Sequence, residues 1–402
     1  MEKPKVPKRK GKIVFTGGGS GGHTFTAMTI LDELSSRNPD ILSRVVFLVG
    51  SLGMEGEKET ISLEEKLCKS KGVRSVRIRS GKLPRRVALR TLVVLWGVVG
   101  GLIDSWKFFS KNKVVLVFST GGYVSVPVCL VAWVKKVPII VHEQTTRVGL
   151  SNKLSAKFAQ KTLVAFEESL KYFPKENTTV VGNPVRKCIF ESLESVKVPP
   201  KIASRLKEFD KRSKNYPVIF IAGGGRGSHL INSTVRQALK ALLIDYQVIM
   251  ITGDNKVYKD YALLDHTIRT LSKDLQSRII LTKFAGDEIG AYFAAADLFV
   301  GRSGAMFVYE VGVTKTPAIF IPIPWVTHNE QYHNAKVLQD LGLARILPQG
   351  ELSADILVQR ISKMIKSIHT KKLDVDDVKL DKLFVTDASK KIVEELENFI
   401  DL

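Results

Sequence analysis

The sequence places a glycine-rich turn directly after an apolar run at two corresponding points, one in each half of the chain. The first is KIVFTGGGSGGHTFTAMTI over residues 12–30, and the second is PVIFIAGGGRGSHLINSTVRQAL over residues 217–239. An apolar run followed by glycines and then by helix-compatible sequence is typical of the first strand, turn and helix of a parallel sheet. The repetition predicts two such domains, each with a glycine loop.

Both loops have the composition of an anion site. Glycine permits backbone conformations with positive φ and lets a ligand come close to main-chain N–H groups. The amino end of the helix that follows favours negative charge. We therefore expect a diphosphate to bind in a cleft between the two domains.

Further apolar runs extend each half into an α/β sheet. The runs that we interpret as buried strands lie at residues 45–49, 114–118 and 138–141 in the first half, and at 248–251, 279–281, 298–300 and 318–321 in the second. The pattern predicts two Rossmann-like domains with parallel sheets. We expect a basic flexible arm over residues 1–12, an N-terminal domain over 13–184, a C-terminal domain over 185–370, and a polar segment with a closing helix over 371–402.

The formal net charge of +21, from 61 Lys and Arg against 40 Asp and Glu, favours an anionic partner. Basic residues gather at 66–90 and again at 107–113, on either side of the apolar stretch LVVLWGVVGGLI at 92–103. This stretch is shorter than the roughly 20 apolar residues that cross a bilayer. It predicts either a helix that docks on an anionic membrane surface or a helix buried against the first sheet. We expect no nucleic acid as partner, because the basic region matches no recognised motif.

The spacing of cysteine and histidine gives no sign of a metal centre. Cys68, Cys129 and Cys188 form no CxxC motif, and their odd number argues against a disulfide framework, which favours the cytoplasm as the compartment. His328 and His333 lack the i, i+4 spacing of a zinc site on a helix. The sequence therefore predicts no bound metal.

The first glycine loop also satisfies the dinucleotide pattern G-x-G-x-x-G through Gly17, Gly19 and Gly22. A nicotinamide or flavin site additionally requires an acidic residue at the end of the second strand, where it binds the ribose hydroxyls. Here the second strand ends in Val-Gly-Ser-Leu at residues 49–52. We therefore disfavour a dehydrogenase and expect no cofactor.

Three further features are candidates for chemistry. His23 follows the first glycine run, where an imidazole can act as a general base near neutral pH, although a capping or core histidine is the simpler interpretation. Glu310 lies in the helix after the strand at 298–300, where its carboxylate can accept two hydrogen bonds from a ribose, unless it is an ordinary solvated glutamate. The segment HNEQYHN at 328–334 is dense in donors and acceptors, which suits a sugar or, more simply, a solvated loop.

Seven motifs in order carry a resemblance to a known family. They are GGGSGGH at 17–23, GGYVSVP at 121–127, HEQ at 142–144, GNPVR at 182–186, the glycine loop at 223–227, RSGA at 302–305, and NEQYHNA at 329–335. In this order the chain resembles the MurG family of bacterial N-acetylglucosaminyltransferases. The resemblance implies a GT-B fold and the inverting transfer of GlcNAc from UDP-GlcNAc, a substrate and not a cofactor. The implied acceptor is the MurNAc 4-hydroxyl of undecaprenyl-diphospho-MurNAc-pentapeptide, and the resemblance also implies a peripheral position at the cytoplasmic face of the bacterial membrane.

The resemblance also assigns expected roles to residues. His23 becomes the leading candidate base. The implied acceptor-binding residues are Gly19, Ser20, Gly21, Gly22, Gly121, Gly122, Tyr123, Glu143 and Thr145. The implied donor-binding residues are Arg186, Gly224, Gly225, Arg226, Ser228, Phe284, Ala285, Ala305, Met306, Glu310, Glu330 and Gln331. Among these, Arg186 is expected near the diphosphate, Glu310 on the ribose, and Glu330 with Gln331 toward the GlcNAc hydroxyls.

The match departs from the family's usual pattern in both predicted pockets. The departures are Thr26, Thr145, Gly225, Arg226, Phe307 and Glu330. They leave donor identity and acceptor detail less well defined than the fold. The alternatives that stay open are a GT-B glycolipid synthase with a diacylglycerol acceptor, a non-catalytic membrane scaffold that binds UDP-sugar, and a non-hydrolysing sugar-nucleotide epimerase.

Overall fold

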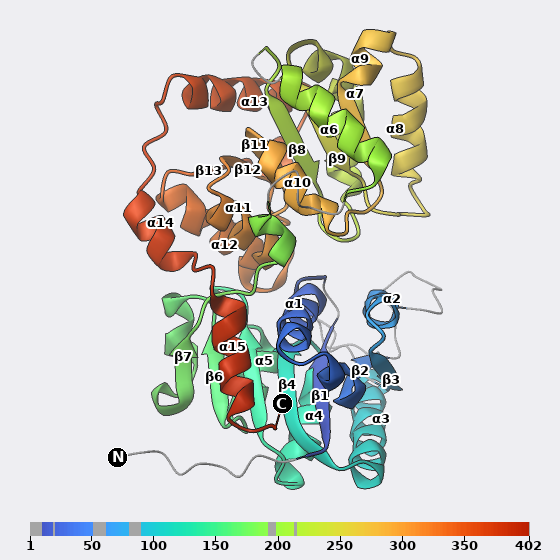
Figure 1. The fold of residues 1–402 in the computed structure, drawn as a ribbon, viewed down its shortest axis with the longest axis vertical. Coiled ribbons are helices and arrows are strands. Elements are labelled where there is room, and N and C mark those ends of the chain that lie inside the picture. The colour runs from blue at the N-terminus through green and yellow to red at the C-terminus, as the bar shows by residue number, and fades with distance from the viewer. Residues whose placement is uncertain are drawn as a thin grey trace. The chain divides into compact units, whose positions relative to one another are not determined.

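A computed structural model of the protein describes residues 10–18, 21–50, 62–79, 90–191, 198–212 and 215–401. The predicted flexible arm up to residue 9 and the basic segment at 80–89 lie outside these residues. The chain divides into two compact units (Figure 1). Unit 1 comprises Met1–Pro184 and Val385–Leu402, and unit 2 comprises Val185–Phe384. The predicted C-terminal segment at 371–402 is thus shared between the two units.

Unit 1 contains a seven-stranded parallel sheet in the order β3-β2-β1-β4-β5-β6-β7. Its strands are β1 (Lys12–Gly17), β2 (Val45–Gly50), β3 (Arg74–Ile78), β4 (Val114–Gly121), β5 (Ile139–Glu143), β6 (Lys161–Val164) and β7 (Thr178–Val180). Its helices are α1 (Gly21–Arg37), α2 (Leu63–Ser70), α3 (Arg90–Lys111), α4 (Ser125–Val134), α5 (Leu150–Ala156) and α15 (Ala388–Glu397).

Side chains alternate along each strand of unit 1, so the sheet has an apolar core on both faces. Ile13 and Phe15 of β1 belong to the cluster that α1 and α15 cover. Val14, between them, belongs to the cluster that α3 and α4 cover on the other face. The closing helix therefore returns to the first domain and packs beside α1 (Figure 1), where Arg37 binds Glu397 with 2.8 Å between Nη1 and Oε1.

Unit 2 contains a six-stranded parallel sheet in the order β10-β9-β8-β11-β12-β13. Its strands are β8 (Val218–Ala222), β9 (Gln247–Ile251), β10 (Ile279–Thr282), β11 (Leu298–Gly301), β12 (Ala318–Phe320) and β13 (Ala344–Ile346). Its helices are α6 (Pro200–Arg212), α7 (His229–Asp245), α8 (Asp260–Arg269), α9 (Lys273–Ser277), α10 (Glu288–Ala295), α11 (Ala305–Thr314), α12 (Glu330–Asp340), α13 (Ala354–His369) and α14 (Asp377–Leu383).

The two sheets share the arrangement that positions a site. In each, the first strand lies inside the sheet, the second and third strands extend to one side, and the fourth and all later strands extend to the other. The order in which strands are added to the sheet therefore reverses beside β1 in unit 1 and beside β8 in unit 2. Ligands of open α/β sheets bind at the carboxyl ends of the strands beside such a point. Both glycine loops leave their sheets there, and the predicted α/β class is confirmed.

Candidate functional site

In unit 1 the carboxyl ends of β1 and β4 approach each other through glycine. The N–H of Gly18 donates to the carbonyl oxygen of Gly121 at 3.2 Å. Gly121 and Gly122 have φ of +99° and +91°, and a Cβ on Gly122 would lie 2.0 Å from the Gly18 carbonyl oxygen. Any other residue at 122 would separate the two loops. Gly21 and Gly22 begin α1 beside this contact, and the partly exposed Tyr123 follows it. Gly19 and Ser20 lie outside the described residues.

His23, in the first turn of α1, meets the end of β5. Its Nδ1 lies 2.7 Å from Oε1 of Gln144, a residue 121 positions later in the chain. The main-chain carbonyl of His23 accepts a hydrogen bond from the Thr120 hydroxyl at 3.0 Å, which fixes the turn against β4. The imidazole is partly exposed. The residue therefore neither caps its helix nor lies in the core.

Glu143, predicted to contact the acceptor, is buried and held by neighbouring donors. Its Oε1 accepts from the main-chain N–H of Thr145 at 3.0 Å and lies 2.7 Å from the Thr145 hydroxyl. Its Oε2 accepts from the Asn152 amide at 2.9 Å. Both carboxylate oxygens are thus used within the protein. Thr145, one of the departures from the family's pattern, is a partner of this carboxylate.

In unit 2 the glycine loop packs directly against the end of β9. Gly224 and Gly227 have φ of +97° and +75°, and a Cβ on Gly227 would lie 1.7 Å from the Thr252 carbonyl oxygen. Gly225 and Arg226 are exposed at the tip of the loop. Ser228 caps α7, because its hydroxyl accepts from the main-chain N–H three residues later. The loop therefore presents its tip and the amino end of α7 to solvent.

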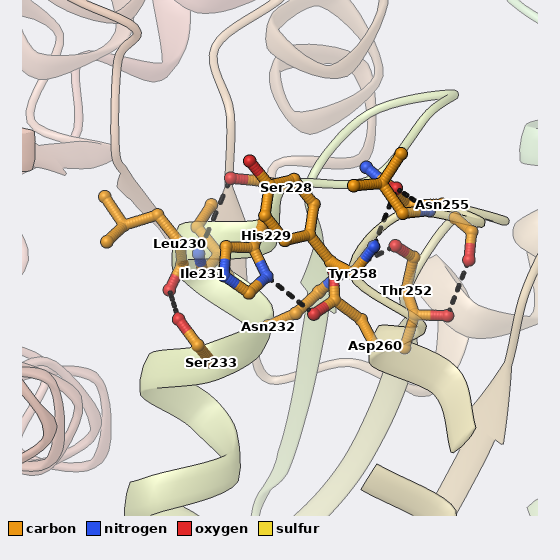
Figure 2. A network of polar contacts seen from close by, with 12 residues as sticks. Ser228, His229, Leu230, Ile231, Asn232, Ser233, Thr252, Asn255, Tyr258 and Asp260 are labelled. Carbon is orange, nitrogen blue, oxygen red and sulfur yellow. Dashed lines mark hydrogen bonds and ion pairs between the residues drawn. The ribbon is translucent and has the colours of Figure 1, made fainter. Parts of the chain in front are cut away.

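A network of polar contacts anchors the start of α7, as Figure 2 shows. The Nδ1 of His229 lies 2.8 Å from Oδ1 of Asp260, at the start of α8. The Asn232 amide donates to Oδ2 of the same carboxylate at 3.0 Å and to the Thr252 carbonyl oxygen at 2.9 Å. The ring of Tyr258 stacks on the imidazole with 3.8 Å between centroids. The sequence analysis did not find this network, because its members come from two helices and a loop.

Arg302, directly after β11, is a second residue that the sequence analysis did not assign to the site. Its side chain is buried, and its Nη2 donates to the Ser228 hydroxyl at 2.9 Å while Nη1 donates to the Ile321 carbonyl oxygen at 2.8 Å. Burial lowers the pKa of this guanidinium to about 10, so it carries its charge at neutral pH. Its position in the sequence could have indicated a role at the site, because Arg302 comes just after a predicted strand and begins the RSGA motif.

Arg186 and Glu310, predicted as separate donor ligands, contact each other. The guanidinium donates from Nε to Oε1 at 2.7 Å and from Nη2 to Oε2 at 2.8 Å. The Glu310 side chain is 0% exposed, and burial raises its pKa above the ordinary range while the guanidinium opposes that effect. A bidentate pair of this kind is geometrically specific. The two residues therefore form one feature of unit 2.

The other predicted donor residues lie on three segments of unit 2. Phe284 is half exposed after β10, and its main-chain carbonyl accepts from the Thr282 hydroxyl at 2.7 Å; Ala285 follows it. Ala305 and Met306 are buried in the first turn of α11. Glu330 and Gln331 begin α12, where Oε1 of Gln331 accepts from the main-chain N–H of Ile323 at 3.0 Å.

No group of metal-ligating side chains occurs within the described parts of the chain. Across those same residues, every helix is too short or too polar to cross a bilayer. The three cysteines are buried and free.

Two family models match the chain. The glycosyltransferase family 28 N-terminal domain matches residues 13–164, and the family 28 C-terminal domain matches residues 218–392. Curated proteins named UDP-N-acetylglucosamine–N-acetylmuramyl-(pentapeptide) pyrophosphoryl-undecaprenol N-acetylglucosamine transferase are similar over most of their length. The protein from Staphylococcus carnosus is 33% identical, with 88% of this chain and 89% of the relative covered. That from Legionella pneumophila is 30% identical, with 95% of each covered.

Solved structures share the fold at lower identity. MurG from Acinetobacter baumannii has a TM-score of 0.64 at 23% identity, covering 96% of this chain and 99% of that one. A UDP-GlcNAc 2-epimerase from Neisseria meningitidis has a TM-score of 0.59 at 14% identity, covering 96% and 98%. These likenesses confirm the predicted GT-B fold. Since the similarity to the curated transferases spans both domains at 30% identity or more, the chain belongs to the MurG family of N-acetylglucosaminyltransferases.

Proposed function

We propose that this protein transfers GlcNAc from UDP-GlcNAc to the MurNAc 4-hydroxyl of undecaprenyl-diphospho-MurNAc-pentapeptide, in peptidoglycan synthesis. The observation that carries the proposal is the similarity, over 88% and 95% of the chain, to two transferases whose name states this transfer of N-acetylglucosamine. The contacts of His23 with Thr120 and Gln144 at the ends of β4 and β5, and the pairing of Arg186 with Glu310 of α11, support it. The acceptor oxygen attacks the anomeric carbon, the bond to the diphosphate breaks, and UDP leaves with the electron pair while the sugar inverts.

For the donor, we assign the UDP-GlcNAc site to unit 2. Glu310 binds the ribose and Arg186 the diphosphate, so donor binding exchanges their mutual contact for contacts with the ligand. The glycine loop supports the phosphates through Gly224, Gly225, Arg226 and Ser228, near the charge of Arg302. The remaining contacts are the main chain of Phe284 and Ala285 with uracil, Ala305 and Met306 with the nucleotide, and Glu330 and Gln331 with the GlcNAc hydroxyls. The donor charge is thereby met by arginines and helix ends, and we expect no metal.

For the acceptor, we assign the site to the loops of unit 1. We assign the contacts with the lipid-linked sugar to Gly21, Gly22, Gly121, Gly122 and Tyr123, together with Gly19 and Ser20, which lie outside the described residues. Glu143 and Thr145 hold the end of β5 in place, since their side chains bond each other. His23 accepts the proton of the attacking hydroxyl, which increases its nucleophilicity as the bond forms.

The test measures UDP release from UDP-GlcNAc by the purified protein, with and without a short-chain analogue of the lipid acceptor. We expect release that depends on the acceptor, with GlcNAc recovered on the lipid. Release with a diacylglycerol acceptor alone would replace the proposal with a glycolipid synthase. Conversion of UDP-GlcNAc without any acceptor would indicate an epimerase, and UDP binding without turnover a scaffold.

We also propose that unit 1 docks on an anionic membrane surface, at the cytoplasmic face of the bacterial membrane. Val99, Ile103 and Trp106 are spaced by four and three residues, which places them on one face of α3, and they are 45%, 44% and 46% exposed. The ammonium of Lys135 lies 4.0 Å from the centre of the Trp106 ring. An apolar helix face beside basic residues is typical of interfacial binding.

Sedimentation with vesicles tests the docking surface. We expect binding to phosphatidylglycerol vesicles at low salt and less binding at high salt, because salt screens the attraction. Ile103→Asn is expected to weaken binding, whereas Val378→Asn, at a valine that is 83% exposed on unit 2, serves as the matched control. Equal binding of both variants and the wild type would exclude this face of α3.

A further inference from the structure

We propose that Gln144 is a positioning residue that fixes the tautomer of His23, so that Nδ1 carries the hydrogen and Nε2 is the atom that accepts the acceptor's proton. The inference deepens the proposed transferase reaction and rests on it for the role of His23. It follows from a run of hydrogen bonds within unit 1 that joins α1, β4, β5 and the turn at Gly182.

The orientation of the Gln144 amide is determined by its surroundings. Its Nε2 lies 2.9 Å from the Thr120 carbonyl oxygen and 2.9 Å from the His142 carbonyl oxygen. A carbonyl oxygen only accepts hydrogen bonds, so the atom facing both must be the amide nitrogen. Rotating the amide by 180° would place its oxygen against two other oxygens. The amide oxygen therefore faces His23.

His142 strengthens this assignment from the other side. The Nε2 of His142 lies 3.0 Å from the Gly182 carbonyl oxygen, so it carries the hydrogen and leaves a lone pair on Nδ1. This Nδ1 lies 3.3 Å from Nε2 of Gln144, so its lone pair also faces the amide nitrogen. Burial lowers the pKa of His142 to about 4, which keeps the ring uncharged at neutral pH. Three acceptor atoms thus surround the Gln144 nitrogen.

The consequence for His23 is a defined tautomer. Its Nδ1 lies 2.7 Å from the amide oxygen, which has no hydrogen to donate, so the hydrogen of the contact belongs to Nδ1. The uncharged ring then has its lone pair on Nε2. Within the described part of the chain, Nε2 has no hydrogen-bond partner, and the ring is partly exposed. A base that is to remove a proton from a ligand needs a lone pair on its accessible atom.

Two carboxylates lie on elements that adjoin the start of α1 and the end of β5, and both have partners other than the imidazole. Glu64 of α2 lies near the start of α1, where its Oε1 is 3.4 Å from the Thr24 hydroxyl. Glu143 of β5 is bonded to Thr145 and Asn152 instead of to the imidazole. Among the described residues, Gln144 is therefore the side chain that contacts the His23 ring through a hydrogen bond, and the contact is uncharged.

Nitrogen NMR of the protein labelled with ¹⁵N-histidine tests the tautomer directly. The His23 signals, assigned by their loss in His23→Ala, should show a protonated Nδ1 and an unprotonated Nε2 at a pH where the ring is uncharged. The reverse pattern would overturn the inference. The measurement needs no turnover, so it stands apart from the transferase assay and from any variant that fails to fold.

The positioning role is tested with Gln144→Met, which keeps the length of the side chain but cannot accept the hydrogen bond. We expect kcat to fall roughly tenfold while UDP-GlcNAc affinity is unchanged. We also expect the ¹⁵N signals of His23 to show a mixture of the two neutral tautomers in this variant, because no acceptor then holds the hydrogen on Nδ1.

Gln247→Met is the matched control. Gln247 is also buried, and its Nε2 also donates to two carbonyl oxygens, those of Phe209 and Tyr216 at 3.0 Å each, but it lies at the start of β9 in unit 2. It should lose comparable stability and leave the tautomer of His23 unchanged. A mixture of tautomers in both variants, or in neither, would reduce Gln144 to a structural residue.

Discussion

The two units share a strand order but differ in the charge of the side chains at the carboxyl ends of their sheets. In unit 1 the central contacts join side chains without a fixed charge, from His23 through Gln144 to His142, and the buried Glu143 carboxylate is held by an amide and a hydroxyl. In unit 2 the corresponding region holds a buried ion pair and the buried guanidinium of Arg302.

The difference indicates how one backbone arrangement suits two tasks. An imidazole surrounded by neutral donors and acceptors can gain and lose a proton without opposing a fixed charge. A diphosphate with its departing electron pair instead requires positive charge already in place. Under the proposed reaction, unit 1 accepts the proton of the attacking hydroxyl, and unit 2 stabilises the negative charge of the departing UDP.

Removal of the imidazole is expected to have the largest effect. His23→Ala should lower kcat by about 10²–10⁴-fold, because the attacking hydroxyl loses its general base. The affinity for UDP-GlcNAc should stay close to the wild-type value, since the donor is assigned to unit 2. Single-turnover kinetics and UDP-GlcNAc titration measure the two quantities. Near-normal turnover would mean that another group accepts the proton, and the role proposed for unit 1 would be wrong.

Disruption of the pair between Arg186 and Glu310 is expected to have the next largest effect, a loss of stability. Glu310→Gln leaves the Arg186 guanidinium without its carboxylate, and we expect a loss of about 3 kcal/mol in the unfolding free energy of unit 2. UDP affinity should fall as well. Denaturant unfolding followed by a probe in unit 2 measures the loss. Asp340→Asn is the matched control, because its pair with Lys336 is exposed to solvent and contributes little to stability. Equal stability of both variants would show that the pair is not what distinguishes unit 2.

The fold could be predicted because the central strands are continuous apolar runs. The predicted runs at 45–49 and 218–221, for example, fall within β2 (Val45–Gly50) and β8 (Val218–Ala222). The strands that the sequence analysis missed lie toward the sheet edges or are short, as with β3 (Arg74–Ile78) and β13 (Ala344–Ile346). The apolar pattern of β3 is interrupted by Arg74 and Arg77, because an edge strand is only partly buried.

Site residues could be predicted where a single sequence motif contains them. They could not be predicted where the site depends on contacts between residues far apart in the sequence. The glycine loops and His23 follow strands directly, so the sequence places them at the carboxyl ends of the sheets. The contact between His23 and Gln144 joins residues 121 positions apart, and that between Arg186 and Glu310 joins residues 124 apart. Local pattern does not report such pairs. The sequence analysis therefore named both residues of the ion pair but not their pairing.

Acid should destabilise unit 1 through His142. Its pKa is about 4 in the folded protein and about 6.5 when unfolded, so between these values the unfolded chain binds more protons. Stability is therefore complete above pH 6.5 and falls as the pH falls toward 4. We expect a loss of about 2 kcal/mol between pH 7 and pH 5.

Tryptophan fluorescence can isolate this effect. Three of the four tryptophans lie in unit 1, so Trp325→Phe leaves a protein whose emission reports that unit alone. In this background His142→Gln should remove the 2 kcal/mol difference, whereas His369→Gln, at an exposed histidine of unit 2, should not. The same acid loss with and without His142 would assign it to the carboxylates instead.

The smallest predicted effect concerns the anchor of the second glycine loop. Asp260→Asn removes the charge that holds His229 and Asn232 at the start of α7 (Figure 2), and a hydrogen bond of this kind contributes about 1 kcal/mol. We expect the KM for UDP-GlcNAc to rise about fivefold with little change in kcat, because the loop binds the donor but does not move the proton. Asp265→Asn, on the same helix with an exposed partner in Arg269, should change neither constant. If Asp260→Asn lowered kcat and left KM unaltered, the loop would stabilise the transition state instead of only binding the donor. Unit 2 would then contribute to the chemical step as well as to binding, contrary to the comparison drawn between the two units.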